Sequence, residues 1–518
     1  MRGNGAAPYS ALVSAGVGSA LGIACLVVLG AAMAVNRSLW LDESMLLASV
    51  DADPWLPPGV ELSRYEQALP YGSYLILKLV ATLGGVSETA LRLPIMLAWL
   101  IGVLLTFAAA RRVAGPALAA VAVAGCVLAY NSVTQATMFK HYAFEFLATA
   151  VLILIAAELD RRPRLGIAVG FTAASALAVV FSNGAVFVSI AIALIVLLRH
   201  LPEIRRSARA RIFAAVLGAG YLLWFVVWYL LVIRPSSAAQ FENRSYELAG
   251  LDSFIASLLG TTQYTGQTLG PALSWTPWVV VGVALVLAAE RRRLMLWPAV
   301  LAVVVGLCGL AALVGVAPFL TPRHLLFVTP VVALAVATGL AATLGRLRVR
   351  AAVRWAARAT AVVVVAVLAV PAVQSARTLI EETRPLYSAA EDECPKLWTY
   401  YGAQPATEVY APVYAPSVPV IGTVPVDSAE NTIGWTWQIR ESYPSYIEAS
   451  VELVTGEPEV CLVIAHAYAG DDVALLAAFR DAGAHCGVLR REFGAELYHC
   501  RTAAASATNG SDSPPGWL

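Results

Sequence analysis

The stretch Trp40-Leu41-Asp42-Glu43-Ser44 places two adjacent carboxylates directly after an apolar run, Leu12 to Val35, that is long enough to cross a bilayer. An ionised carboxylate costs roughly 3 kcal/mol or more near the bilayer centre, so both side chains must be held at the water boundary. Two interpretations are open. Asp42 caps an interfacial helix that starts at Glu43, or it is the general base of a membrane enzyme.

The composition is that of a polytopic membrane protein. Hydrophobic residues make up 59% of the 518 residues, charged residues make up 13%, and the mean hydropathy is +0.71. The net charge of +1 gives no indication of a nucleic-acid partner. The pattern predicts about eleven transmembrane helices, at 12–35, 93–110, 116–131, 142–157, 165–181, 184–198, 212–233, 274–289, 294–316, 324–345 and 357–372.

The apolar stretch Tyr71 to Leu83 is too short to be a further span. At about 1.5 Å per residue it reaches about 20 Å, against a hydrocarbon thickness of about 30 Å, so we expect an interfacial helix. Arginines then concentrate in the loops predicted to be cytoplasmic. This asymmetry predicts a cytoplasmic N-terminus and a plasma-membrane protein whose C-terminal part lies outside the cell.

The remainder of the chain reads as a small extracytoplasmic α/β domain at 373–501, followed by a disordered tail at 502–518. We expect strands at Glu408 to Tyr414 and Glu459 to Ala465, and a helix at Asp472 to Ala482. Four cysteines in this region fit an oxidising compartment and allow three disulfide pairings, of which Cys486 with Cys500 is favoured.

Polar side chains gather on the predicted outer face of the transmembrane domain, 1–372, in which 36–92 forms the first outer loop. They comprise Asp42, Glu43, Lys78, Arg92, Lys140, His141, Tyr142, Asn183, Gln263, Tyr264 and Arg323. A carboxylate facing cations suits the transfer of a group from an anionic leaving group, because the carboxylate takes a proton while the cations meet growing phosphate charge. Beyond Asp42 and Glu43 the sequence shows no clustered ligands, so we expect no metal and no cofactor.

Several of these residues also have purely structural interpretations. Arg323 and Arg92 each open a predicted span and could anchor it by snorkelling. Lys78 could mark the polar face of the interfacial helix, and His141 could be an interfacial histidine. A transporter or flippase of lipid-linked glycans, or a catalytically inactive envelope scaffold, also remains open. A transporter would show paired broken helices and internal repeats, which this sequence lacks.

The acidic pair after the first span, the interfacial helix that ends in Gly, and Glu88-Thr89-Ala90-Leu91-Arg92-Leu93-Pro94 together resemble the GT-C membrane glycosyltransferases that use polyprenyl-phosphate sugars. This group includes protein O-mannosyltransferases, aminoarabinose transferases of lipid A, and actinobacterial cell-envelope mannosyl- and arabinosyltransferases. The resemblance covers roughly 36–345. Together with frequent arginine and alanine, it suggests a bacterial, actinobacterial enzyme similar to these mannosyl- or arabinosyltransferases.

The resemblance implies a role for each matched residue. Asp42 takes the place of the catalytic base, with Glu43 as its companion. Met138-Phe139-Lys140-His141-Tyr142 falls where relatives show Glu-x-Arg-x-Tyr, so Lys140 matches the arginine, whereas Met138 replaces the glutamate. Arg323 corresponds to a basic residue before a late span.

The sequence therefore predicts an all-α polytopic GT-C fold with an external α/β domain, acting as an inverting glycosyltransferase. Its partners would be a polyprenyl-phosphate sugar donor, a glycan, lipid or protein acceptor, and membrane lipids. Asp42 and Glu43 are the catalytic candidates. The candidates for donor phosphate binding are Lys140, Arg323, Lys78, Arg92 and His141, and those for sugar or acceptor binding are Tyr142, Asn183, Gln263 and Tyr264.

Overall fold

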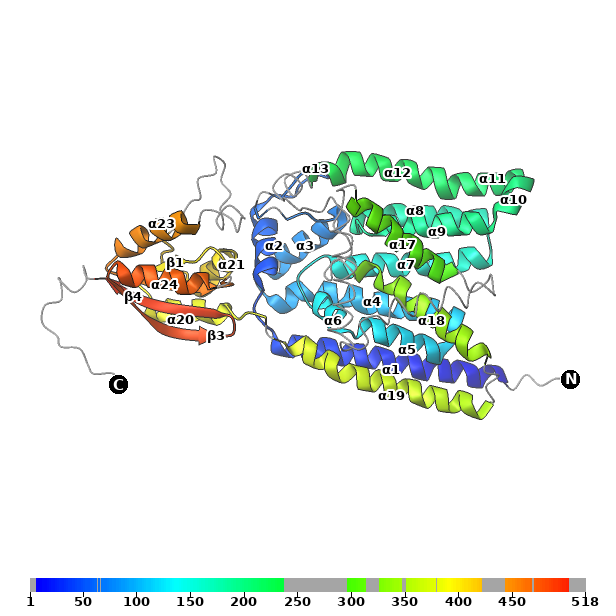
Figure 1. The fold of residues 1–518 in the computed structure, drawn as a ribbon, viewed down its shortest axis with the longest axis horizontal. Helices are drawn as coiled ribbons and strands as arrows, with labels where there is room; N and C mark the ends of the chain where they lie inside the picture. The colour runs from blue at the N-terminus through cyan, green and yellow to red at the C-terminus, as the bar shows by residue number, and fades with distance from the viewer. Residues whose placement is uncertain are drawn as a thin grey trace, which may run out of the picture.

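The computed structural model describes residues 6–236, 296–313, 326–346, 351–421 and 443–502, apart from 63, 66, 379, 468 and 469. Two arrangements of secondary structure follow each other along the chain. A helical part comes first and a four-stranded sheet with flanking helices comes last, and the two lie at opposite ends of the molecule (Figure 1).

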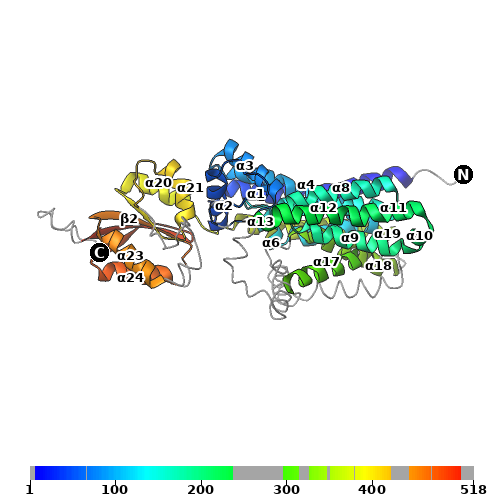
Figure 2. The same ribbon diagram turned by 90° about the horizontal axis from the view of Figure 1, so that it is seen from above.

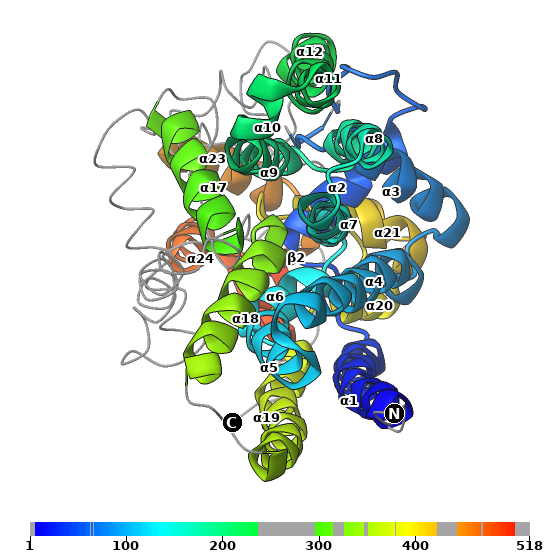
Figure 3. The same cartoon turned by 90° about the vertical axis from the view of Figure 1, so that its right-hand side faces the viewer.

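Long apolar helices run alongside one another in the helical part. The helices are α1 Ala6–Val35, α2 Leu41–Ala52, α3 Tyr71–Gly84, α4 Glu88–Ala114, α5 Pro116–Val127, α6 Tyr130–Ala136, α7 Tyr142–Arg161, α8 Leu165–Phe181, α9 Ala185–Arg199, α10 Leu201–Arg206, α11 Ala208–Ala215, the π-helix η1 Val216–Gly220, α12 Tyr221–Trp228, the π-helix η2 Tyr229–Ile233, α13 Arg234–Ser236, α17 Leu296–Leu313, α18 Thr329–Arg346 and α19 Ala351–Arg377. Seen end-on, α1 and α19 lie side by side at one edge, and α11 and α12 form the opposite edge (Figure 3).

The predicted apolar runs form helix where the structure describes them, with 116–131 divided between α5 and α6. The run 274–289 and the ends of 294–316 and 324–345 lie outside the described residues. By length and hydropathy, five helices of the described residues are long enough to cross a bilayer alone, or six if α5 and α6, which are bent by 71°, count as one span. The other apolar helices, such as α8 and α9, are shorter. The architecture is therefore that of a multi-pass membrane protein, and the figure of eleven spans stays a prediction.

Two short helices, α2 and α3, lie across the end of the bundle that faces the sheet (Figures 1 and 3). The stretch Tyr71 to Leu83 forms α3, as the sequence predicts, and Gly85 follows it with φ of 56°, a left-handed conformation that favours glycine. Helix α1 begins at the far end of the bundle, away from the sheet (Figure 2).

The last part of the described chain builds a mixed sheet. Its elements are α20 Arg384–Glu393, β1 Leu397–Thr399, α21 Gln404–Tyr414, α23 Tyr443–Thr455, β2 Glu459–Ala465, α24 Asp471–Asp481, β3 Ala484–Glu492 and β4 Ala495–Thr502. The strand order is β1-β2-β4-β3, with β1 parallel to β2 and with β4 antiparallel to both β2 and β3. The strand predicted at Glu459 to Ala465 and the helix predicted near Asp472 to Ala482 are confirmed.

The strand predicted at Glu408 to Tyr414 is wrong, because this segment lies in helix α21. Its valines and tyrosines favour a strand locally, but α21 buries Val409 and Tyr410 on one helical face, and this packing overrides the propensity. The disulfide Cys486–Cys500 is confirmed, and it joins directly paired residues of β3 and β4. A second disulfide joins Cys394 to Cys461.

Candidate functional site

The first turn of α2 holds a fully buried carboxylate. The Glu43 oxygens accept hydrogen bonds from Arg92 Nε at 3.0 Å, from Arg92 Nη2 at 2.9 Å, and from the backbone amides of Trp40 at 3.0 Å and Phe139 at 2.5 Å. Glu43 therefore joins α2, α4 and the loop between α6 and α7.

Burial by itself raises the pKa of the Glu43 carboxyl, but the adjacent Arg92 and Arg37 guanidiniums outweigh it and hold that pKa below its ordinary value. Arg92 also donates to backbone carbonyls, from Nη1 to that of Arg37 at 2.7 Å and from Nη2 to that of Ser38 at 3.0 Å. An ionised carboxylate so enclosed is an anchor for the loop before α2. Arg92 is also buried and completes that anchor, because its hydrogen bonds go to Glu43 and to the carbonyls of Arg37 and Ser38.

Asp42 lies beside Glu43 but points differently, because successive helical residues are rotated by about 100°. Its side chain is 23% exposed, and its Oδ2 lies 4.0 Å from the buried Nζ of Lys140, which donates to Gln67 Oε1 at 2.8 Å. The structure thus brings together the carboxylate and the cation singled out in the sequence. The interpretation of Asp42 as a helix cap is wrong, since α2 begins at Leu41 with Trp40 as its N-cap residue.

Lys78 lies on α3 beneath the other end of α2. Its ammonium donates to the carbonyls of Val50 and Asp53, each at 2.7 Å, and to that of Asp51 at 3.4 Å. These carbonyls lie at the C-terminal end of α2, where the last carbonyls of a helix lack intrahelical partners and a cation is stabilising. Lys78 therefore fastens α2 onto α3.

The outer turn between α8 and α9 contains Asn183, which is half-buried. The buried Glu145 carboxylate of α7 accepts from Ser182 Oγ at 3.4 Å and from the backbone amides of Asn183 and Gly184. A Cβ on Gly184 would meet the Phe327 ring at 2.5 Å, so only glycine lets the segment before α18 approach this turn.

The remaining candidate residues fall in two groups. His141 and Tyr142 lie at the start of α7, directly after Lys140, with their rings 4.5 Å apart. Gln263, Tyr264 and Arg323 lie outside the described residues.

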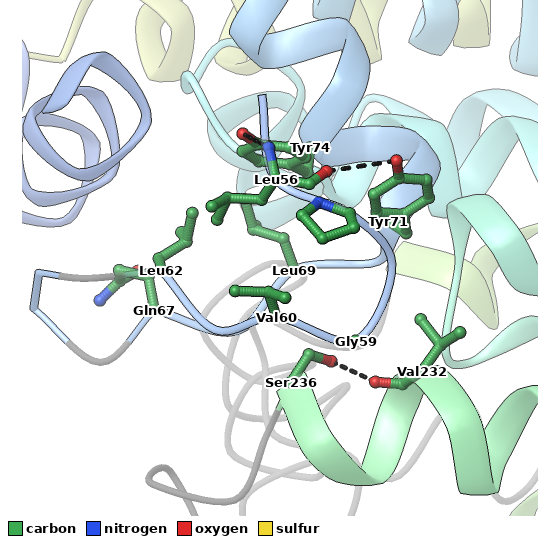
Figure 4. A pocket seen from close by; sticks show the side chains of 11 residues that line it. Leu56, Gly59, Val60, Leu62, Gln67, Leu69, Tyr71, Tyr74, Val232 and Ser236 are labelled. Carbon is green, nitrogen blue, oxygen red and sulfur yellow. Dashed lines mark hydrogen bonds between the residues drawn. The ribbon is translucent and has the colours of Figure 1, made fainter. Parts of the chain in front are cut away.

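A small space adjoins Gln67, the residue whose Oε1 accepts from Lys140 (Figure 4). It has a volume of about 20 Å³, roughly that of one water, and lies between the loop after α2, Tyr71 and Tyr74 of α3, and Val232. Asp42 and Lys140 are not among its lining residues.

The sheet-bearing part, which follows α19, holds the loop before α2 through hydrogen bonds. The Glu382 carboxylate accepts from Ser38 Oγ at 3.0 Å and from the Ser38 amide at 3.2 Å. The Tyr410 hydroxyl accepts from the Leu39 amide at 2.7 Å and donates to Glu88 at 3.0 Å. These contacts join segments more than 320 residues apart and set the position at which α2 begins.

Sequence reasoning missed Glu145, Glu382 and Tyr410. A carboxylate inside an apolar span was a signal available for Glu145, because such residues are expensive in a membrane unless they have a purpose. Glu382 and Tyr410 carry no sequence signal, since their importance comes entirely from tertiary contacts.

Comparison with known proteins finds solved structures that are similar to the whole chain. No family model and no curated protein matches the chain. Among solved structures, the Archaeoglobus fulgidus oligosaccharyltransferase in complex with Zn and sulfate matches 92% of this chain and 72% of its own length, with 12% identity and a TM-score of 0.50. ArnT from Cupriavidus metallidurans bound to undecaprenyl phosphate matches 95% of this chain and 98% of its own length, with 14% identity and a TM-score of 0.49.

The chain shares its fold with this oligosaccharyltransferase, which is the predicted GT-C fold. In this fold, α2 and α3 form a shelf across the end of the helical bundle that faces the sheet (Figure 1), and Asp42 lies in the first turn of α2. The predicted fold class is thereby confirmed, while the roles of individual side chains are matters for proposal.

Proposed function

We propose that this chain is an inverting glycosyltransferase that moves a sugar from a polyprenyl-phosphate donor to an acceptor hydroxyl on the outer face of the cell membrane. The observation that carries the proposal is the partly exposed Asp42 carboxylate, 4.0 Å from the buried ammonium of Lys140. A GT-C fold shared with an oligosaccharyltransferase supports it further. The helical part, 1–372, would hold the chemistry, and the part from 373 to 501 would lie outside the cell.

The proposed reaction uses the two charges in one step. Asp42 takes the proton of the acceptor hydroxyl while that oxygen attacks the anomeric carbon of the donor. The bond from the anomeric carbon to the phosphate oxygen breaks, and its electron pair leaves on the polyprenyl phosphate. Lys140 meets the charge that grows on this phosphate, in a site where its burial strengthens the electrostatic interaction. The product is a glycoside of inverted configuration.

The other candidates divide by their contacts. We assign Glu43, Arg92 and Lys78 to positioning, because their polar atoms are engaged with α2 and with the loops around it. Arg323 and His141 remain proposed for the donor phosphate. The residues proposed for the sugar or the acceptor are Tyr142, Asn183, Gln263 and Tyr264. Mannose and arabinose are the first donor sugars to try, on the basis of the sequence resemblance.

A transfer assay with purified protein and a panel of polyprenyl-phosphate sugars tests the proposal. Asp42→Asn should lower turnover by at least about 10²-fold, the scale of general base catalysis. Asp51→Asn is the matched control, since Asp51 is an exposed carboxylate on the same helix. A folded Asp42→Asn protein with the parental rate would remove Asp42 as the base. Movement of a lipid-linked glycan across vesicles without transfer would instead favour the flippase.

A further inference from the structure

Gln67, in the loop after α2, contacts the proposed phosphate ligand. Its Oε1 accepts a hydrogen bond from the buried Lys140 ammonium at 2.8 Å, whereas Asp42 Oδ2 lies 4.0 Å from the same nitrogen, beyond hydrogen-bonding distance. An amide oxygen is neutral, so it orients the ammonium and leaves the positive charge available to a phosphate. An ammonium has three donors, and a partner that takes one of them directs the other two. The position of Gln67 therefore determines how Lys140 is aimed.

The Gln67 side chain is itself held in place. Its Nε2 donates to the backbone carbonyl of Tyr65 at 3.3 Å and lies 3.9 Å from the sulfur of Met45, a buried residue of α2. An amide whose nitrogen is bound on one side presents its oxygen on the other side. The orientation of Gln67 therefore depends on where Tyr65 lies.

Tyr65 has an unusual backbone conformation. Its φ is 57°, a left-handed value that non-glycine residues retain mainly where the surrounding structure enforces it. The carbonyl of the preceding residue, Arg64, accepts from the buried Ser49 hydroxyl of α2 at 2.7 Å. The buried Tyr65 side chain reaches the sheet-bearing part, where its hydroxyl donates to the Glu408 carboxylate at 2.8 Å. The turn is thus fixed from α2 on one side and from α21 on the other.

Glu408 of α21 is the far end of this series of contacts. Its Oε1 accepts from the Tyr65 hydroxyl, and its Oε2 accepts from Arg64 Nη1 at 2.7 Å. Burial and the Glu408 carboxylate both raise the pKa of the Tyr65 hydroxyl, so this group stays protonated and remains the donor. The contacts run from the sheet-bearing part, through Tyr65 and Gln67, to the proposed phosphate ligand.

We propose that Gln67 is a positioning residue for the Lys140 ammonium, and that the Tyr65 hydrogen bond to Glu408 lets the sheet-bearing part hold Gln67 in place. The inference rests on the proposed transferase function, because the aim of Lys140 matters to catalysis only if Lys140 meets the leaving phosphate. The hydrogen bonds of the sheet-bearing part described above act on the loop before α2, whereas this one acts on the loop after it.

Transfer kinetics of the full chain in lipid nanodiscs, with polyprenyl-phosphate mannose or arabinose as donor, test the role of Gln67. Gln67→Met should lower kcat about tenfold with little change in KM, because a misplaced group loses transition-state stabilisation. The Gln67→Met/Lys140→Met double variant should be no slower than Lys140→Met alone, because residues that act as a unit are not additive. A merely structural loss would instead multiply with the loss of Lys140. Gln374→Met, which changes an exposed glutamine of α19, is the control.

Tyr65→Phe tests the contact with the sheet-bearing part, since it removes only the hydroxyl that reaches Glu408. It should lower kcat several-fold, and the Tyr65→Phe/Lys140→Met double variant should be no slower than Lys140→Met alone. Hydrogen exchange of the peptide that carries Tyr65 and Gln67 should become at least about threefold faster in Tyr65→Phe. Tyr414→Phe, on the same helix as Glu408, is the control and should leave both quantities unchanged.

Three outcomes overturn the proposal alone. They are parental kcat in folded Gln67→Met while Lys140→Met is impaired, multiplying losses in the double variants, and unchanged hydrogen exchange in Tyr65→Phe. If Gln67→Met does not fold, the Tyr65→Phe cycle with Lys140→Met decides in its place. Parental kcat in Lys140→Met is a different failure, because it removes the phosphate role from the proposed function and the positioning role of Gln67 with it.

Discussion

The Glu43 carboxylate accepts a hydrogen bond from the Phe139 backbone amide at 2.5 Å. Asp42 precedes Glu43 and Lys140 follows Phe139, so this single contact fixes the distance between the proposed base and the proposed phosphate ligand. The contact is buried and reinforced by Arg92, which makes Glu43 a positioning residue for both.

Glu43→Gln should therefore act mainly by lowering the free energy of unfolding, and not by changing the reaction step itself. The substitution leaves Arg92 buried without its counter-charge, and breaking a buried pair in this way costs about 3–5 kcal/mol. We expect a large fall in Tm, measured by thermal unfolding in detergent with the exposed Asp51→Asn as control. A variant with parental Tm and no turnover would show instead that Glu43 takes part in catalysis.

Lys140→Met should lower kcat with little change in KM. Loss of one preorganised charge at a developing anion costs about 10²- to 10³-fold in rate, and Lys140→Arg should recover part of it. Lys396→Met is the matched control, because this lysine pairs with Glu457 in the sheet-bearing part. Equal losses in kcat/KM for Lys140→Met and Lys396→Met would contradict the phosphate role.

Glu381 should make stability depend on pH. Burial raises the pKa of its carboxyl from 4.5 to about 8, so the folded state holds a proton that the unfolded state releases between these values. Unfolding free energy should fall through this window as pH rises, by on the order of a few kcal/mol. Glu381→Gln should remove that slope in a series of Tm measurements across the window. An unchanged slope in the variant would assign the pH dependence to other groups.

The two disulfides should contribute unequally. Cys394–Cys461 closes a separation of 67 residues and Cys486–Cys500 one of 14, so the loop-entropy account gives about 4 and about 3 kcal/mol respectively. Replacing each pair with alanine should therefore lower Tm more for the first pair. Differential scanning fluorimetry of the two double variants, beside the parent under reducing conditions, measures this order. The reverse order would mean that native packing outweighs chain entropy.

The sequence was sufficient for the helices and for the pairing of Asp42 with Lys140, because apolar length and sidedness are local properties. The sequence did not show that Glu43 is a buried positioning residue whereas Asp42 is partly exposed. Two adjacent carboxylates look alike in a sequence and differ only in the neighbours that the fold brings to them. Lys78 and Arg92 look like ligands in a sequence, but they act on the carbonyls and the carboxylate of the shelf. Helix α21 was predicted wrongly for the same reason, because contacts with distant segments determine the conformation of its tyrosine and valine residues.

The hydrogen bonds of Glu382 and Tyr410 to Ser38 and Leu39 mean that the helical part cannot be separated from the sheet-bearing part without losing contacts at the start of α2. A chain that ended at residue 377 would keep its apolar helices but lose the hydrogen bonds that set where α2 starts. Any other domain that replaced the sheet-bearing part during evolution would therefore have to supply equivalent hydrogen bonds to the loop before α2.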